Sequence, residues 1–211
     1  MLRSAKSLFG YNLHESDSLL GTVYDLYFDD KRRNVRHVVA ELGNIFRKRK
    51  VLIAGNLLGM VDPVTHMLFI HQSGEELGHD PSSDADKPVH QQFQDQAKEY
   101  YQWVAHWTPF SGAPIPKWEF VFTGDSHLRS VRHLLGYTLK AHGETVGEVE
   151  DFLVDTDQWI LPHFLVRRAP ALGGKVAAFP IDHIQDYDWE NRTLTLSCDK
   201  TLIADAPEYI A

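Results

Sequence analysis

Short apolar stretches separated by polar turns dominate the hydrophobic pattern of this chain. In the first 73 residues, the stretches rich in β-branched or aromatic residues are Val23–Phe28, Val35–Leu42, Val51–Ile53 and Met67–Ile70. Turn-forming pairs such as Asp29-Asp30 and Asp62-Pro63 lie between them. This pattern predicts several short β-strands joined by tight turns.

The same pattern occurs twice. A shift of 126 residues aligns residues 2–71 with residues 128–197 without a gap. The identical positions include Leu2/Leu128, Arg3/Arg129, Ser4/Ser130, Gly10/Gly136, Tyr11/Tyr137, Gly21/Gly147, Asp25/Asp151 and His37/His163. A repeat of this length is typical of a duplicated domain, because the repeats of solenoids are shorter. We therefore expect one repeat in residues 1–73 and a second in residues 127–211.

Each repeat is expected to form a small closed β-barrel. Several short strands within about 70 residues, without a long amphipathic helix, favour a barrel over a sandwich, and closure removes exposed strand edges. Gly21 and Gly147 lie where a polar loop enters a long strand, and a residue without Cβ permits a bulge or a close backbone approach there. Residues 181–184 predict one helical turn before the last strands.

Residues 74–126 differ from both repeats. Residues 74–88 are acidic and rich in Gly, Pro, Ser and Asp, which predicts a loop or a partly disordered linker. From about residue 88 to residue 107, apolar residues recur at steps of three and four and predict an amphipathic helix. An extended aromatic segment follows. We expect the apolar side of the helix either to cover one or both barrels or to contact a second copy in a homodimer.

Charge is distributed unevenly along the chain. The net charge is −8, of which residues 1–73 carry +3, residues 74–126 carry −6 and residues 127–211 carry −5. Nucleic-acid-binding proteins usually contain a basic domain or stripe, which only the first repeat could supply. A nucleic-acid partner is therefore not expected.

Other features of the composition indicate a cytoplasmic protein. The chain contains no run of 18 apolar residues, so no transmembrane segment is expected. The first repeat starts at Leu2, with no signal-peptide core before it. The single cysteine, Cys198, fits a reducing compartment.

The recurring motifs resemble those of PRC-barrel domains. Each repeat contains Leu-Arg-Ser, then Gly-Tyr, then a loop ending in glycine, and then Val-x-Asp in a strand. The matching segments are "LRSAKSLFGYNL" and "LLGTVYDLYFDD" in the first repeat, and "LRSVRHLLGYTL" and "TVGEVEDFLVDT" in the second. The linker "DADKPVHQQ" and the ending "DAPEYIA" are similar to those of bacterial tandem PRC-barrel proteins, so the resemblance covers nearly the whole chain.

The resemblance implies a mainly β fold, with two PRC-type barrels that arose by tandem duplication and are joined by a helix-containing linker. In that family the six-stranded barrel is a binding or scaffold module of the photosynthetic reaction-centre H subunit and of a ribosome-maturation factor. We therefore expect a non-catalytic protein-interaction or scaffold module with a protein partner. One alternative is a peripheral, H-subunit-like role in photosynthetic electron and proton transfer at a membrane complex. The other is an RNA-processing or ribosome-associated factor.

Two aspartates interrupt apolar strands at matching positions. Asp25 and Asp151 recur together with Arg3 and Arg129, and an unpaired buried carboxylate is costly. We therefore predict the structural pairs Arg3–Asp25 and Arg129–Asp151. The functional alternative, by analogy with the H subunit, is a proton-conducting carboxylate.

Two groups of residues are candidates for binding a partner. The basic cluster consists of Arg47, Lys48, Arg49 and Lys50. It can attract an anionic ligand, an acidic partner or the acidic part of the same chain. The second group is the aromatic part of the linker, with Tyr100, Tyr101, Trp103, Trp107 and Trp118.

No recognisable motif indicates catalysis or metal binding. The histidines are scattered and lack the short fixed spacing of zinc ligands. Cys198 has no histidine close to it in sequence, and the chain contains neither a nucleophile elbow nor a phosphate-binding glycine loop. We expect neither an enzyme nor a bound metal or cofactor.

Overall fold

Two halves with matching orders of elements make up the structure. The computed structural model describes residues 1–16, 18–44, 47–71 and 127–210. The first half contains β1 (Leu2–Ser4), α1 (Ala5–Leu8), β2 (Asn12–Glu15), β3 (Ser18–Asp29), β4 (Val35–Asn44), β5 (Arg47–Ala54), η1 (Gly55–Leu57), β6 (Leu58–Asp62) and β7 (Met67–Ile70). The second half contains β8 (Leu128–Ser130), α4 (Val131–Leu134), β9 (Thr138–Ala141), β10 (Glu144–Asp155), β11 (Ile160–Arg168), η3 (Pro170–Leu172), β12 (Val176–Pro180), η4 (Ile181–His183), β13 (Ile184–Asp188), β14 (Thr193–Leu196) and α5 (Lys200–Asp205).

Each half forms the main part of a mixed seven-stranded sheet. The strand order is β5-β4-β3-β2-β7-β6 in the first half and β12-β11-β10-β9-β14-β13 in the second. The pairs β2–β7 and β9–β14 are parallel, and the other neighbours are antiparallel. The fold is therefore mainly β, as the sequence predicts, and its two sheets have the same strand order.

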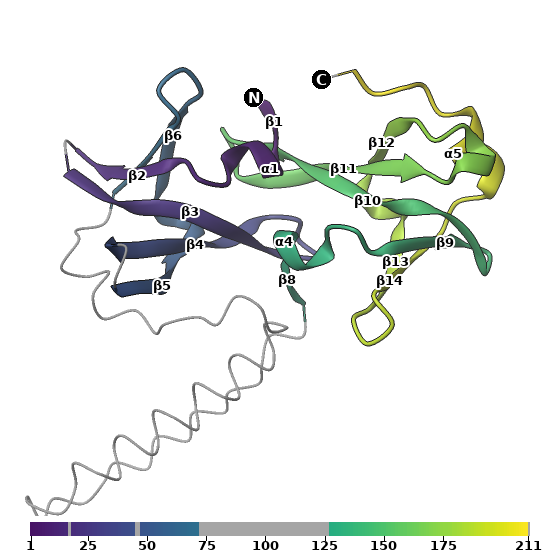
Figure 1. The fold of residues 1–211 in the computed structure, drawn as a ribbon, viewed down its shortest axis with the longest axis horizontal. Helices are drawn as coiled ribbons and strands as arrows, with labels where there is room; N and C mark the ends of the chain where they lie inside the picture. Colours follow the sequence, from purple (N-terminus) through teal and green to yellow (C-terminus); the bar gives the residue numbers. More distant parts are fainter. Residues whose placement is uncertain (17, 45–46, 72–126, 211) are drawn as a thin grey trace, which may run out of the picture.

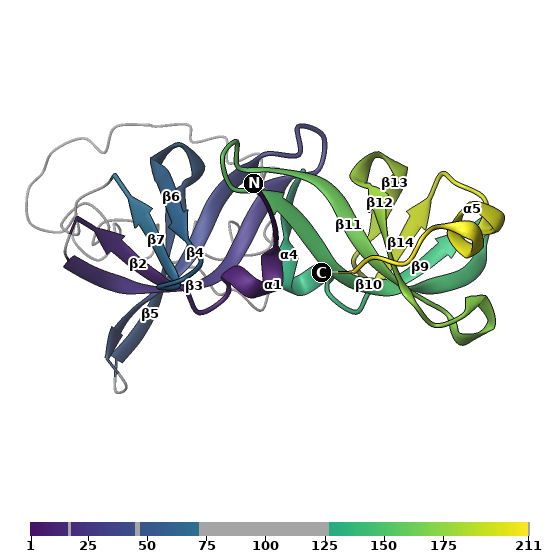
Figure 2. The same ribbon diagram turned by 90° about the horizontal axis from the view of Figure 1, so that it is seen from above.

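The seventh strand of each sheet comes from the other half. β1 pairs with the end of β10, where Leu2 lies opposite Asp155, and β8 pairs with the end of β3, where Leu128 lies opposite Asp29. The short helices α1 and α4 follow these strands onto the opposite half (Figure 1). The turns that follow β3 and β10 also meet, because the Val35 amide donates to the Trp159 carbonyl at 2.7 Å. The two halves are thus interlocked side by side in an elongated body (Figure 2).

The predicted closed barrels are not found. One sheet ends in β5 and β6, and the other ends in β12 and β13. Within the described ranges, β5 does not pair with β6, and β12 does not pair with β13. The long strands β3 and β10 pair with their own half at one end and with the exchanged strand at the other. Each sheet therefore covers a core that both halves share and does not close around a core of its own.

The hydrophobic core is continuous across the two halves. Buried side chains of both sheets and of both exchanged helices belong to one cluster. Within this cluster, the rings of Phe28 from the first half and Phe152 from the second lie 5.6 Å apart. Because burying apolar surface is the main stabilising contribution to folding, we infer that the two halves unfold together.

Most strands predicted from the hydrophobic pattern are confirmed. β3, β4, β5 and β7 include the four predicted stretches, and η4 is the predicted helical turn. The role predicted for Gly21 and Gly147 is confirmed as well, since a Cβ there would lie 2.4 Å and 2.2 Å from the carbonyl oxygens of Glu41 and Arg167. The helix predicted at about residues 88–107 lies outside the described residues.

Candidate functional site

The exchanged helices create two matched junctions between the halves. At the first, Ser130 is the N-cap of α4, and its hydroxyl accepts a hydrogen bond from the His133 amide at 2.9 Å. The same hydroxyl donates to the carboxylate of Asp25 at 2.5 Å. Asp25 also accepts the backbone amide of Arg132 at 2.9 Å, so the β3 carboxylate holds the start of a helix from the other half.

The second junction repeats these contacts with the halves interchanged. Ser4 is the N-cap of α1 and its hydroxyl donates to Asp151 on β10. The backbone amide of Lys6 donates to the same carboxylate at 3.1 Å. Both Ser-Asp contacts therefore lie between the repeats and hold the interlocked halves together.

Burial has the largest effect on the pKa of both carboxyl groups. It raises the pKa of Asp25, which is fully buried, to about 6, although the hydrogen bonds from Ser130 and Arg132 act in the opposite direction. Burial also raises the pKa of Asp151, against the hydrogen bonds from Ser4 and from two backbone amides. Both carboxyl groups therefore protonate more readily than exposed aspartates do.

These contacts show that the predicted Arg3–Asp25 and Arg129–Asp151 pairs were wrong. The arginines have other partners: Arg129 forms an ion pair with Asp30 at 2.7 Å, and Arg3 donates to the Met1 sulfur at 3.1 Å. The physical reason is the exchange, because each aspartate meets a capping hydroxyl and a free amide in the first turn of a helix. Such groups satisfy a carboxylate without a cationic side chain.

A cation–aromatic surface, formed by Phe9, Tyr24, Lys50 and Arg132, lies next to the first junction. The Lys50 ammonium is 3.6 Å from the centre of the Tyr24 ring. The Arg132 guanidinium is 4.4 Å from the same ring and 4.5 Å from the Phe9 ring, and its Nε donates to the Tyr24 carbonyl at 2.9 Å. Neither cation has a carboxylate within ion-pairing distance among the residues that the structure describes.

At the matching place in the second half, a carboxylate neutralises the cations. Glu150 stands where the first half has Tyr24, and it pairs with Lys6 at 2.7 Å and with Arg167 at 2.6 Å. Burial acts to raise the pKa of Glu150, but the hydrogen bonds from these two cations lower it overall. Val176 stands where the first half has Lys50. The two halves thus share one frame but differ in surface charge at this position.

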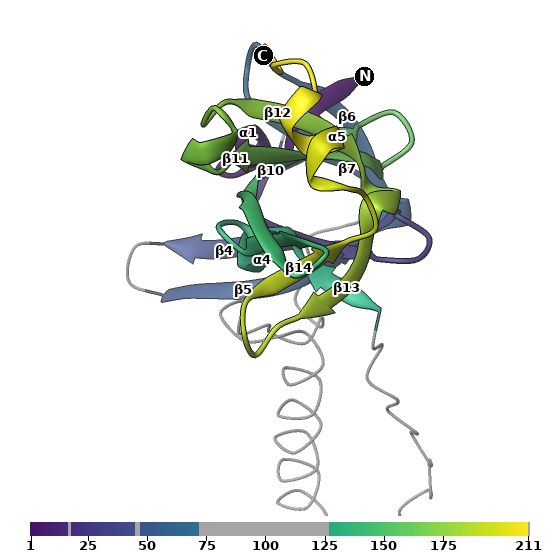
Figure 3. The ribbon, with the colours of Figure 1, turned by 90° about the vertical axis from the view of Figure 1, so that its right-hand side faces the viewer.

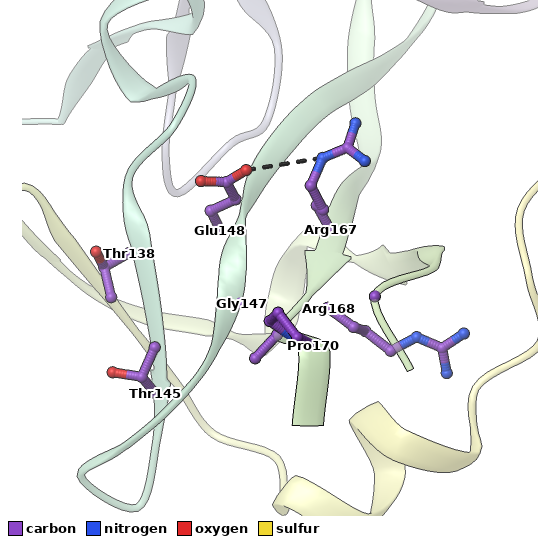
Figure 4. Close-up of a pocket in the computed structure, with 9 residues that line it drawn as sticks. Thr138, Thr145, Gly147, Glu148, Arg167, Arg168 and Pro170 are labelled. Atoms are coloured by element: carbon purple, nitrogen blue, oxygen red, sulfur yellow. Dashed lines mark ion pairs between the residues drawn. The ribbon is translucent and has the colours of Figure 1, made fainter. Parts of the chain in front are cut away.

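An open hollow of about 430 Å³ lies in the second half, between β9, β10 and the end of β11 (Figure 4). Glu148 and Arg167 face each other across its rim at 3.7 Å, and Thr138 and Thr145 line one side. Arg168 points away from the hollow, and its Nη1 donates to the Ala204 carbonyl at the end of α5 at 2.7 Å. The charged groups of the hollow are therefore committed to partners within the protein.

The described residues include one of the two groups that were predicted to bind a partner. Arg47, Lys48, Arg49 and Lys50 lie on β5, and Lys50 belongs to the cation–aromatic surface. The aromatic residues predicted to bind a partner lie outside the described residues; they are Tyr100, Tyr101, Trp103, Trp107 and Trp118. Tyr24 and Arg132 were not predicted, although a signal existed, because Tyr24 and Lys50 are positions at which the aligned repeats differ in charge.

The described ranges contain no group of three potential metal ligands among His, Cys, Asp and Glu side chains. Cys198 is a buried free thiol, and burial raises its pKa, which disfavours the reactive thiolate. No helix within the same ranges is long and apolar enough to cross a membrane. Lys50 and Arg132, which have no carboxylate partner within the described ranges, are placed to attract an anion.

Comparison with known proteins gave no assignment: no family model and no curated protein matches this chain.

Proposed function

We propose that the protein is a non-catalytic scaffold of the PRC-barrel type, which uses the cation–aromatic surface of its first half to bind a protein partner. The family part of the proposal is supported by the duplicated motifs. Leu-Arg-Ser and Gly-Tyr lie at the same places in two sheets of the same strand order.

The observation that carries the binding role is the difference between the matched surfaces. Arg132 is held in one orientation by two aromatic rings and by the bond from its Nε to the Tyr24 carbonyl. Its terminal nitrogens have no carboxylate partner within the described ranges, and the Lys50 ammonium lies over the same Tyr24 ring. An arginine fixed in this way can bind a carboxylate with two parallel hydrogen bonds. In the second half, the carboxylate of Glu150 already fills the corresponding role.

The net charge of −8 favours a local acidic segment of a protein over a long polyanion. A nucleic acid or an anionic membrane would be repelled by most of the protein, because such partners need an extended basic surface. The RNA-related role and the peripheral reaction-centre role therefore remain alternatives that the same experiment distinguishes.

Site-specific photo-crosslinking in the native cells tests this proposal. Benzoylphenylalanine replaces Phe9 in one protein and Leu135, the matching residue of the second half, in the control. We expect one protein to be crosslinked from position 9 and not from position 135. The crosslink should be lost when Arg132→Glu is added, because a carboxylate would then repel the acidic partner.

The other outcomes discriminate among the alternatives. Crosslinks to RNA alone would favour the RNA-related role, and crosslinks to subunits of a membrane-bound electron-transfer complex would favour the reaction-centre role. Equal crosslinking from both positions, or crosslinks that persist in Arg132→Glu, would overturn the cation–aromatic surface as the binding site.

A further inference from the structure

The C-terminal segment of the chain lies against the edge strand of the second half. The backbone amide of Tyr209 donates to the carbonyl of Val176, the first residue of β12, at 2.8 Å. The adjacent Glu208 forms an ion pair with Lys175 at 2.6 Å. The C-terminal segment therefore contacts this sheet edge through a backbone hydrogen bond and an ion pair. Figure 3 shows the course of this segment beside the second half.

The edge strand of the first half, β5, pairs with β4 in the same register in which β12 pairs with β11. Lys50 lies opposite Glu41 as Val176 lies opposite Arg167, and both pairs are related by the 126-residue shift. In an antiparallel pair, the backbone groups of successive residues point alternately toward and away from the partner strand. Since the Val176 carbonyl points outward to Tyr209, the backbone groups of Lys50 are expected to point outward from the sheet as well.

Among the residues that the structure describes, no strand pairs with the outer edge of β5. β4 is the one strand that pairs with β5 in the part of the chain that the structure describes. An edge of this kind presents unpaired amide and carbonyl groups and can accept an added strand. β5 has eight residues and no proline, whereas β12 has five and ends at Pro180, so β5 offers the longer edge.

The charges along β5 select the kind of segment that would fit. Four consecutive basic residues, Arg47, Lys48, Arg49 and Lys50, occupy the first half of the strand. The Lys50 side chain carries this basic character onto one face of the sheet, where its ammonium meets the Tyr24 ring of β3 and lies near the Arg132 guanidinium. An extended segment that carries glutamate or aspartate would bring its carboxylates to this run of basic residues on β5, as Glu208 lies beside Lys175 at the edge of the second half.

We propose that β5 binds an acidic, extended segment of the protein partner as an added β-strand. This inference rests on the proposed scaffold function and names the way in which the partner binds. Backbone hydrogen bonds to β5 supply pairing, and the basic residues of β5 select acidic side chains.

The test uses the isotope-labelled full chain and an alternating glutamate–valine hexapeptide, with binding followed by backbone amide shifts in NMR spectra. Two further peptides carry N-methyl groups on alternate residues, one on the odd positions and the other on the even positions. Each retains all its charges but lacks the amide donors on one of its edges. We expect shifts centred on β5, and we expect one N-methylated peptide to bind about tenfold more weakly while the other binds like the parent.

A charge-reversal variant and its matched control test the selection for acidic segments. Lys50→Glu is expected to weaken binding of the unmodified peptide by about tenfold, because it places a carboxylate at the edge. Lys31→Glu changes the net charge by the same amount. Lys31 lies in the turn between β3 and β4, far from the turn that joins β4 to β5, so this variant should leave the affinity unchanged. The spectra of both variants report directly whether the fold is retained.

Equal affinities for the two N-methylated peptides would overturn strand addition. So would the absence of shifts on β5, or protection from exchange, before peptide is added, of the β5 amides that point away from β4. These results are distinguishable from a failure of the scaffold function. A partner crosslinked from position 9 that depends on Arg132 would still support the binding surface, even if the peptides showed no pairing with β5.

Discussion

Replacing Asp25 by asparagine should stabilise the protein near neutral pH. The Asp25 carboxylate is fully buried at the first junction and accepts hydrogen bonds from the Ser130 hydroxyl and from the amides of Leu26 and Arg132. Both amides donate to the same oxygen, Oδ1, which the amide oxygen of asparagine can replace. The asparagine NH2 group would then face Ser130, whose hydroxyl oxygen can accept a hydrogen bond.

The magnitude follows from the pKa of Asp25. Burial raises this pKa from 3.8 to about 6, so the folded state holds the proton more tightly than the unfolded state does. The resulting stabilisation is fully present below pH 3.8 and is lost as the pH rises through 6. A shift of this size corresponds to about 3 kcal/mol of unfolding free energy. Since the changed contact with Ser130 costs about 1 kcal/mol, Asp25→Asn should be more stable than the natural protein by about 2 kcal/mol at pH 7.5.

Urea unfolding at a series of pH values between 4 and 7.5 measures this difference. The useful quantity is the unfolding free energy of Asp25→Asn minus that of the natural protein, because the titration of every other group cancels. We expect this difference to be small or negative near pH 4, to rise between pH 4 and about pH 6, and to level off above that. Carbon NMR of the Asp25 carboxyl group gives the pKa independently.

A difference that does not change with pH would refute this reasoning. A variant that is less stable at every pH would mean that the hydrogen bonds to the charged carboxylate outweigh the cost of burying it. Asp151→Asn is the matched comparison at the second junction, where burial also raises the pKa. Its pH-dependent difference should have the same sign as that of Asp25→Asn.

Three further predictions concern the exchange and the C-terminal segment. Residues 1–71 alone should form a homodimer, because β1 and α1 of each copy can join β3 of the other; light scattering that showed a folded monomer would contradict this. Arg168→Leu, which copies Leu42 of the first half, should lower the unfolding free energy by about 1–3 kcal/mol, because partly buried carbonyls at the end of α5 lose their donor; an unchanged urea midpoint would refute it. Deleting residues 207–211 should uncover β12 and allow it to bind the glutamate–valine peptide, and amide shifts that stay confined to β5 would contradict this.

The strands could be predicted because their signals are local. Alternation of apolar and polar residues, together with turn residues at their ends, indicates β3, β4 and β7 without knowledge of the rest of the fold. Gly21 could be interpreted for the same reason, since a glycine at the entry to a long strand points to a close approach of two backbones.

The exchange of β1 and β8 could not be predicted from these local signals. Each strand has three residues, and both have the same sequence, Leu-Arg-Ser. Either copy could therefore supply the same hydroxyl, Ser4 or Ser130, to the same aspartate. Which copy does so depends on the chain connections in three dimensions. The predictions of closed barrels and of Arg–Asp pairs within each repeat followed from assuming that each copy folds on itself.

The candidate site was predicted only in part, because it is assembled from both repeats. The charge of the sequence indicated Lys50 and its neighbours, but Arg132 lies 82 positions later and reaches this surface through the exchange of α4. Comparing the two copies position by position would have drawn attention to Tyr24, whose counterpart is Glu150. In a duplicated protein, differences between matched surface positions are therefore informative about function.

Having both copies in one chain also explains why the two edges can differ. In a homodimer of a single repeat, both edge strands would carry the same residues and would bind the same kind of segment. In this chain, Ser4 and Ser130 preserve the same junction in both halves, while Lys50 and Val176 have diverged on the edges. The identical junctions hold the body together, so substitutions on an edge need not disturb the core. One edge can then be occupied by the chain's own acidic segment, and the other, as we propose, can remain available for a partner.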